Sequence, residues 1–296
     1  MKNTKLIQAK SALNHLKSQY LPYEWDLNIY RGCSHKCSYC YALYSHQYLD
    51  EDDFFNSIYV KTNIAEVLEK QLVKRTWKKQ LINLGGVTDS YQPVEEKFKL
   101  MRAVLEILIK YSQPVIISTK SNLILRDFDL INELSQKAKV YIAVSLITTD
   151  QELQKIIEPN TASPKDKLNI LKTLKNTKAI VGCHTMPILP YLTDSDKQLD
   201  DLFCAVKKTN ADYILTGLLN LRGKTKYHFL NFVKNRFSEK YGAYCQLYKY
   251  NNKQIYDPYK TDLYARITYL KKKYDLQDYK KEAVIKSDYQ QMELFI

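Results

Sequence analysis

The stretch NIYRGCSHKCSYCYA, which runs from Asn28 to Ala42, places three cysteines within eight residues. Three residues separate Cys33 from Cys37, and two separate Cys37 from Cys40. Thiolates at this spacing on one loop can wrap around one face of an iron–sulfur cluster. A four-iron cubane held by three thiolates keeps one iron without a protein ligand, and a substrate or cofactor can coordinate there. The stretch therefore predicts a metal centre with an open coordination position.

Zinc is the main alternative for the same residues. His35 lies inside the loop and could serve as the fourth ligand of a tetrahedral site. Zinc modules more often present CxxC pairs in two separated knuckles, and the sequence has no second knuckle. A disulfide scaffold is disfavoured because the other cysteines, Cys183, Cys204 and Cys245, are scattered along a long chain.

The composition is that of an ordinary globular protein, with 296 residues, 45% of them hydrophobic and 26% charged. The formal net charge of +13 attracts polyanions such as nucleic acid, although the lysine-rich usage of an AT-rich genome would give the same excess. The longest apolar runs, such as residues 140–147, are too short to span a bilayer. The start MKNTKLIQAK is not followed by the apolar stretch of a secretory signal. We therefore expect a cytoplasmic protein that does not enter a membrane.

Short apolar runs alternate with helix-length amphipathic segments, which is the pattern of a parallel sheet with crossover helices. We expect strands at residues 27–30, 81–84, 115–118, 140–146, 180–184 and 213–215. We expect helices at residues 95–111, 129–139, 165–174 and 196–208, with helix starts at Ser163-Pro164 and Thr193-Asp194. Six such units predict an α/β fold of the partial (β/α)6 TIM-barrel type, with the active-site loops at the carboxyl ends of the strands.

The amino-acid composition changes after about residue 236, where tyrosines and lysines become frequent. We expect an N-terminal segment at residues 1–24, a core at 25–237 and a small basic, tyrosine-rich C-terminal extension at 238–296. A β-hairpin is expected from Tyr244 to Tyr256, with its turn at Asn251-Asn252. A basic and aromatic surface can contact phosphates and stack on bases, but the same composition would suit a solvated cap on the barrel.

The CxxxCxxC spacing after a first strand, with an aromatic residue before the last cysteine, resembles the signature of the radical S-adenosylmethionine (SAM) superfamily. Within it, the chain from about Leu27 to Phe237 looks like the branch of spore photoproduct lyase and its DNA repair photolyase-like relatives. Besides the cysteine loop, this likeness rests on STKSNLILRD (Ser118 to Asp127), VSLITTD (Val144 to Asp150), IIEPNTASPKDKL (Ile156 to Leu168) and MPILPYLTD (Met186 to Asp194).

The resemblance implies a [4Fe–4S] cluster on Cys33, Cys37 and Cys40, with SAM chelated by the remaining iron. An external electron donor of the flavodoxin or ferredoxin type would reduce the cluster. SAM would then be cleaved to a 5′-deoxyadenosyl radical that abstracts hydrogen from a substrate. Resemblance and charge together suggest a nucleic-acid base and a lyase-like reaction. The alternatives are a radical SAM enzyme acting on a peptide or small metabolite, and a non-catalytic zinc-stapled nucleic-acid-binding protein.

Carried over position by position, the resemblance also implies the residues that contact SAM. Gly85 and Gly86 would receive its amino group, because glycine lets the backbone approach a ligand closely. Lys120 would meet its carboxylate, and Ser145 and the backbone of Tyr39 would lie near the rest of the molecule. Each position also has an ordinary structural explanation: a tight turn for the glycines, a solvated loop lysine, a small buried hydroxyl and a packed aromatic ring.

The hydrogen-transfer residues of the family are matched only in part. Tyr39 and Tyr41 match tyrosines assigned to the relay, although both also suit a role as aromatic walls. The cysteine that returns a hydrogen atom in spore photoproduct lyase corresponds here to Val87, which has no comparably weak X–H bond. This departure argues against authentic spore-lesion repair.

Other polar residues follow predicted strands without defining a role. His184, with Cys183 beside it, could contact substrate or relay a proton. Asp89 could orient a ligand, while Glu158-Pro159 and Arg126-Asp127 could simply shape loops. The sequence has neither a phosphate-binding GxxxxGKS motif nor a serine nucleophile elbow, so no other enzyme class has a comparable anchor.

Overall fold

The computed structural model describes residues 3–18, 21–46, 53–249 and 253–279. Its main sheet has seven strands in the order β10-β9-β8-β7-β6-β3-β2, and all neighbours are parallel except β2 and β3. The strands are β2 (Leu13–His15), β3 (Trp25–Leu27), β6 (Ile82–Leu84), β7 (Val115–Thr119), β8 (Val140–Ser145), β9 (Ile180–Ile188) and β10 (Tyr213–Leu218). The predicted α/β class and its barrel-type parallel sheet are confirmed.

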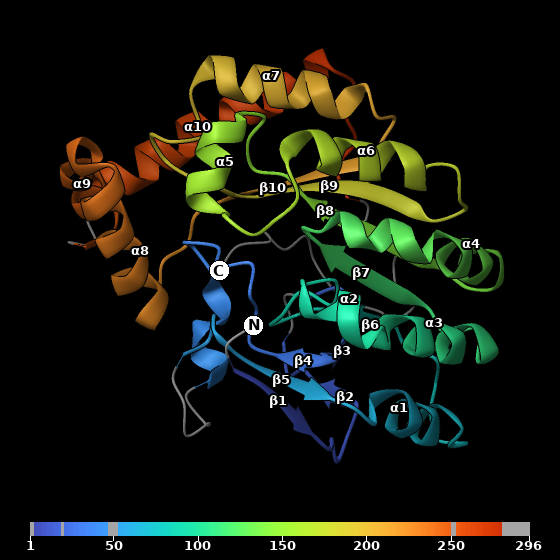
Figure 1. Ribbon diagram of the computed structural model, residues 1–296. Coiled ribbons are helices and arrows are strands. Elements are labelled where there is room, and N and C mark those ends of the chain that lie inside the picture. Colours follow the sequence, from blue (N-terminus) through green and yellow to red (C-terminus); the bar gives the residue numbers. More distant parts are fainter. Residues whose placement is uncertain (1–2, 19–20, 47–52, 250–252, 280–296) are drawn as a thin grey trace.

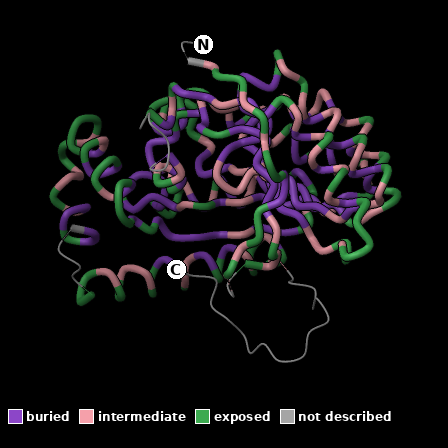
Figure 2. The backbone as a smooth tube through the Cα atoms, turned by 90° about the horizontal axis from the view of Figure 1, so that it is seen from below, coloured by how far each residue is buried: buried purple, intermediate pink, exposed green. Residues whose placement is uncertain are grey.

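Helices line the outer face of this sheet (Figure 1). They are α1 (Ile64–Leu72), α2 (Val94–Phe98), α3 (Leu100–Lys110), α4 (Phe128–Lys137), α5 (Gln151–Ile157), α6 (Pro164–Leu174) and α7 (Asp196–Lys207). A short 3₁₀ helix, η2 (Asn122–Asp127), precedes α4. Buried residues gather along the strands and exposed ones surround them (Figure 2). The apolar faces of both layers form one main core, as crossover connections on a parallel sheet require.

The first predicted strand, 27–30, is divided between two sheets. The chain leaves the main sheet after Leu27 and enters a small sheet of β1 (Asn3–Ile7), β5 (Ser57–Lys61) and β4 (Tyr30–Arg31). The Asn28 side chain occupies the crossing point, where it donates to the Asp26 carboxylate and accepts from the Val87 N–H at 3.0 Å. This crossing places the cysteine loop, which begins directly after β4, beside the carboxyl end of β6.

Two predicted helix boundaries are corrected in detail. The helix expected at 95–111 is broken at Lys99, whose φ of 50° ends α2 and begins α3. The start expected at Thr193-Asp194 lies two residues later, at Ser195-Asp196, because Ser195 forms a capping box with Gln198. Ser163 caps α6 as predicted, by accepting from the Asp166 N–H at 3.1 Å.

The hairpin expected from Tyr244 to Tyr256 is wrong. The segment is helical, with α8 (Gly223–Arg236), α9 (Ser238–Tyr244), the π-helical η3 (Cys245–Lys249) and α10 (Lys253–Lys273). The expected turn at Asn251-Asn252 lies outside the described residues. Leu263, Ile267 and Leu270 recur at helical spacing and join the main core, and this period decides the structure over the local tyrosine content. A domain boundary at residue 237 stays a prediction.

None of the described helices combines the length and the apolar character needed to cross a bilayer.

Gly182 of β9 lies opposite Tyr213 of β10, and the Tyr213 ring fills the space that a Cβ at position 182 would take. We predict that Gly182→Ala lowers the free energy of unfolding by about 1–3 kcal/mol, as overpacking of a core does. Gly242→Ala is the matched control, because no atom lies within 4 Å of a Cβ there and the helical site favours alanine. Urea denaturation of both variants measures the difference, and equal effects would contradict this packing.

Candidate active site

The cysteine loop starts at a glycine that no other residue can replace without displacement. Gly32 has a φ of 77°, and a Cβ there would lie 2.5 Å from the Ser57 carbonyl oxygen. The Gln92 side chain fixes the same turn, because its amide donates to the Gly32 carbonyl at 3.0 Å and accepts from the Ser34 N–H at 2.9 Å. The Cys33 N–H donates to the Phe54 carbonyl. The start of the cysteine loop is therefore held by hydrogen bonds to Gln92 and to the Phe54 carbonyl.

The three cysteines of the loop are free thiols in a desolvated setting. Cys33 and Cys37 are buried and Cys40 is partly buried. Burial raises the pKa of Cys33 to about 12 and that of Cys40 to about 11, and it raises the pKa of Cys37 well above its ordinary value. Cys40 adds to the shift of Cys33, and both add to that of Cys37, so the three sulfur atoms lie close enough to repel as thiolates. Such a trio becomes anionic only with a strong cationic partner, which a bound metal cluster provides.

The side chains of the loop do not form a closed site for a single metal ion. Among the described residues, no three His, Cys, Asp or Glu side chains converge as they would around one metal ion. Thiolates around one zinc lie about 3.8 Å apart, whereas a cubane holds each thiolate on a separate iron. The Ser38 hydroxyl, inside the loop, is buried and has no hydrogen-bond partner within the described part of the chain. An acceptor such as a cluster sulfide would satisfy it.

His35 is committed to hydrogen bonds rather than to a metal. Its Nδ1 lies 2.7 Å from the Asn160 carbonyl oxygen and its Nε2 lies 3.0 Å from Asp89 Oδ2. The Asn160 side chain in turn donates to the Ser34 carbonyl at 2.7 Å. Since both ring nitrogens are occupied, the zinc alternative loses the fourth ligand that the sequence offered it.

Asp89 is the first of two buried carboxylates that fix the loop. Besides His35, it accepts from the Thr119 hydroxyl at 2.9 Å and from the backbone N–H groups of Lys120 at 2.7 Å and Tyr91 at 2.8 Å. Burial alone would raise the pKa of Asp89, but His35 and these N–H donors hold it below its ordinary value. Asp89 therefore links the cysteine loop to the carboxyl end of β7.

Glu158 is the second carboxylate, and no atom of it or of its partner Lys167 reaches solvent. The Lys167 ammonium lies 2.5 Å from Oε2, the Lys120 ammonium lies 3.5 Å from Oε1, and the Tyr39 hydroxyl donates to Oε1. Burial would raise the pKa of Glu158, but the two ammonium groups lower it to about 2. Glu158 therefore stays ionised and joins the loop to β7 and α6.

Lys120, predicted to contact SAM, does lie beside the cysteine loop. Its ammonium stands 5.6 Å from the centre of the Tyr39 ring, and the side chain is 18% exposed. Burial lowers the pKa of Lys120 and Glu158 raises it, with a net rise, so the ammonium keeps its charge at neutral pH. A cation is thus fixed next to the three thiols.

The predicted glycine pair lies at the carboxyl end of β6. Gly85 has a φ of 91°, and a Cβ there would lie 2.8 Å from the Thr88 carbonyl oxygen. A Cβ at Gly86 would overlap the Asp26 carboxylate, which also accepts from the Asn83 amide at 2.8 Å. The Tyr41 hydroxyl donates to the Gly86 carbonyl and joins the loop to this turn, while the residue as a whole is 62% exposed.

Ser145 and His184 are paired across β8 and β9, so they share one face of the sheet. His184 Nε2 lies 3.1 Å from the Tyr213 hydroxyl, and burial, helped by the Lys120 charge, lowers the pKa of His184 to about 4. His184 is therefore neutral and faces the Lys120 side of the sheet. Cys183 lies in the main core instead.

Val87 packs beside the cysteine loop. It joins a small apolar cluster with Cys33, Ala42 and Phe54. Val87, which cannot donate a hydrogen atom as a cysteine thiol does, therefore lies next to the proposed metal centre.

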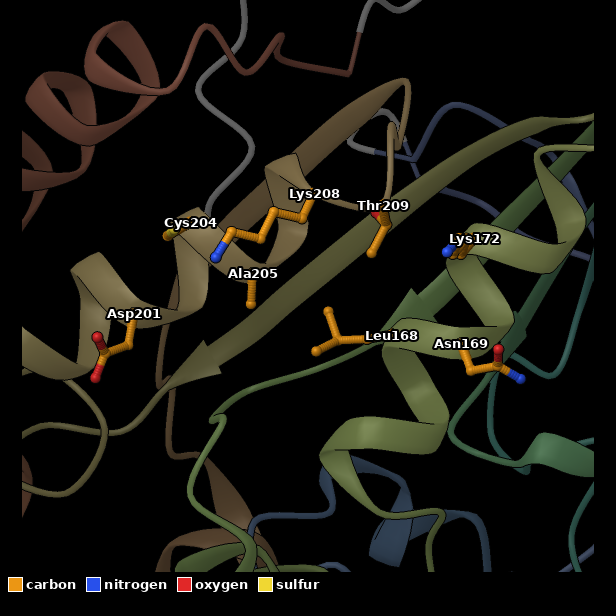
Figure 3. Close-up of a pocket in the computed structure, with 8 residues that line it drawn as sticks. All are labelled: Leu168, Asn169, Lys172, Asp201, Cys204, Ala205, Lys208 and Thr209. Carbon is orange, nitrogen blue, oxygen red and sulfur yellow. The ribbon is translucent and has the colours of Figure 1, made fainter.

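A separate depression of about 350 Å³ lies between α6 and α7 (Figure 3). It is lined by Leu168, Asn169, Lys172, Asp201, Cys204, Ala205, Lys208 and Thr209. These residues belong to the outer helical layer, and none of them takes part in the site around the cysteine loop.

Comparisons with known proteins identify relatives of this chain. Residues 27–203 match the model of the radical SAM superfamily. An uncharacterized protein of Mycobacterium tuberculosis is 36% identical over 82% of this chain and 73% of its own length. An uncharacterized protein of Methanocaldococcus jannaschii is 28% identical over 79% of this chain and 84% of its own.

Among solved structures, a spore photoproduct lyase variant with bound AdoMet and dinucleoside spore photoproduct is similar in fold. The TM-score is 0.59 at 14% sequence identity, over 77% of this chain and 66% of that one. The present chain thus spans about two thirds of the length of that lyase. At this identity the likeness concerns the fold alone.

Lys167 provides a stability test of the buried pair. We predict that Lys167→Met lowers the free energy of unfolding by about 3–5 kcal/mol, because it removes the nearer of the two cations from a buried carboxylate. Exposed Lys165, on the same helix, is the matched control, and Lys165→Met should change stability by less than about 0.5 kcal/mol.

The pH dependence of the same variants gives a second readout. Glu158 ionises below its ordinary pKa of 4.5 in the folded protein, so its stabilisation is complete above that pH and is lost as the pH falls toward 2. In Lys167→Met the pKa of Glu158 rises toward its ordinary value, so the loss of stability between pH 4.5 and 2 should be smaller than in the wild type. Urea denaturation across this range measures it, and an unchanged acid limb would contradict the assignment.

Proposed function

The chain belongs to the radical SAM superfamily, and from this premise we propose that it cleaves SAM reductively and uses the 5′-deoxyadenosyl radical to take a hydrogen atom from a substrate. Enzymes of this family use a [4Fe–4S] cluster and SAM. When bound, the cluster supplies the electron that breaks the sulfur–C5′ bond of SAM. The observation that carries the proposal is the trio of free, mutually close cysteines on one loop, without a fourth protein ligand from His35.

We assign Cys33, Cys37 and Cys40 as the cluster ligands. Lys120 is the proposed partner of the SAM carboxylate, because its charged ammonium is fixed beside the loop. Ser145 is the proposed contact to the rest of SAM, on the strand that follows β7. One external electron donor, of the flavodoxin or ferredoxin type, is expected because each cleavage consumes an electron.

Gly85 and Gly86 are the proposed acceptors for the SAM amino group. Both glycines are partly exposed, and the absence of a Cβ lets Gly85 adopt its φ of 91° and lets Gly86 lie against the Asp26 carboxylate. The Gly86 carbonyl already accepts the Tyr41 hydroxyl, so an amino group bound there would share that oxygen with Tyr41 or displace it.

Tyr39 and Tyr41 are the proposed hydrogen-transfer residues, with a condition that follows from their contacts. The Tyr39 hydroxyl donates to Glu158 and the Tyr41 hydroxyl donates to Gly86. A relay through either phenol requires its hydroxyl to leave that acceptor. In the present arrangement both tyrosines serve to join the loop to its surroundings.

We propose a nucleic-acid base as the substrate, in a lyase-like reaction. The net charge of +13 supports it, and so does α8, a helix without acidic residues. Thr225 in its first turn donates to the Cys40 carbonyl at 2.9 Å, and Tyr227, two residues further along the helix, is 73% exposed. A basic helix that begins at the cysteine loop and carries an exposed aromatic ring suits a strand with an unstacked base.

The cysteine assignment makes a direct prediction. Cys33→Ala, Cys37→Ala and Cys40→Ala should each lose the brown colour, the bound iron and the formation of 5′-deoxyadenosine with dithionite as reductant. Cys183→Ala, Cys204→Ala and Cys245→Ala are the matched controls and should retain all three. A colourless wild-type protein with stoichiometric zinc would contradict the proposal.

The substrate proposal is tested separately. Single-stranded DNA or RNA should raise 5′-deoxyadenosine formation above its uncoupled rate, and base-deuterated strands should transfer deuterium to that product. Duplexes of the same sequence, whose bases are stacked and paired, are the control. Stimulation by a peptide or small-metabolite pool, with none by nucleic acid, would overturn the substrate and leave the enzyme class intact.

A further inference from the structure

Lys120 is held at two points by the two buried carboxylates. Its backbone N–H donates to Asp89 Oδ2 at 2.7 Å, and its ammonium lies 3.5 Å from Glu158 Oε1. Asp89 also lies 3.0 Å from His35, and Glu158 accepts from Tyr39, so each carboxylate touches the cysteine loop as well. The Asp89 and Glu158 carboxylates, which lie outside the cysteine loop, therefore set the position of the Lys120 ammonium relative to that loop.

The two carboxylate oxygens of Glu158 make different contacts. Oε2 takes the Lys167 ammonium at 2.5 Å, while Oε1 takes the Tyr39 hydroxyl and faces the Lys120 ammonium. Lys167 is fully buried on α6, and it holds the Glu158 carboxylate through the oxygen that does not face Lys120. Because the contact to Lys120 is the longer one, that ammonium keeps the capacity to attract a further anion.

A lysine needs such an anchor to act as a fixed contact. Its four-carbon stem loses rotamer entropy when it is immobilised, and prior ordering removes that cost from ligand binding. Here the Tyr39 ring lies under the ammonium at 5.6 Å and Glu158 stands beside it. The ammonium is thus oriented before any ligand arrives.

We propose that Glu158 is a positioning residue for SAM binding: it fixes the Lys120 ammonium beside the cysteine loop so that the SAM carboxylate meets an ordered cation. Lys167 keeps Glu158 in place from α6. This inference rests on the proposed function, in which Lys120 receives that carboxylate. It assigns to Glu158 no contact with SAM itself.

The alternative is that Glu158 merely holds the loop together through Tyr39 and Lys167. A double-mutant cycle separates the two roles, because a residue that acts through Lys120 has no further effect once the Lys120 ammonium is gone. The four proteins are the wild type, Glu158→Gln, Lys120→Met and the double variant. All are full-length and reconstituted with iron and sulfide without oxygen.

The measurements are iron and sulfide content, the dissociation constant of SAM by equilibrium dialysis, and the electron paramagnetic resonance spectrum of the reduced protein with and without SAM. Glu158→Gln should load its cluster and bind SAM about tenfold more weakly, which is about 1.4 kcal/mol. Its spectrum should shift less on addition of SAM. In the Lys120→Met background, Glu158→Gln should cause no further weakening.

Glu158→Gln strands the Lys167 ammonium, so a second variant protects the test against misfolding. Glu158→Gln/Lys167→Met removes both charges of the buried pair and should still bind SAM weakly, because Lys120 remains unanchored. Wild-type affinity in either variant, or equal weakening with and without Lys120, would overturn the inference. A wild-type protein that neither binds SAM nor forms 5′-deoxyadenosine would instead overturn the proposed function.

Discussion

Two buried carboxylates, Asp89 and Glu158, hold the proposed active site together. A carboxylate without access to water must be met by hydrogen-bond donors or cations, so each one fixes whatever surrounds it. Asp89 orders His35 and the Lys120 backbone. Glu158 orders Tyr39 and the Lys120 ammonium. Without them the cysteine loop would have few ties to the sheet on this side.

The fold is what brings these residues into reach of one another. The loops that follow β6, β7 and β8 emerge at the carboxyl ends of neighbouring strands in one parallel sheet, and the cysteine loop after β4 lies beside them because the chain crosses from β3 into the small sheet. Residues separated by more than a hundred positions, such as Tyr39 and Glu158, therefore become neighbours. The same geometry sets Ser145 and His184 side by side on the face toward Lys120.

Local chemistry could be predicted from the sequence, whereas long-range pairing could not. The cysteine spacing, the buried strands and the Ser163 cap depend on residues close in sequence, and they were accessible. His35 is a candidate zinc ligand by sequence because it lies inside the loop, whereas its actual partners Asn160 and Asp89 lie far along the chain. Glu158 looked like a loop residue, although one signal was present: Lys167 shares a helical face with apolar Ile170, Leu171 and Leu174, where a lone lysine needs a buried anion. The helix in the tyrosine-rich C-terminal segment is indicated only by the spacing of Leu263, Ile267 and Leu270, which outweighs the local tyrosine content.

The central claim is that three cysteines hold a cluster and keep one iron for SAM. Mössbauer spectroscopy of protein reconstituted with 57Fe tests it most directly, with SAM and without. We expect one iron of the four to change its spectrum when SAM binds, while the other three do not. A spectrum in which SAM changes none of the irons would contradict it.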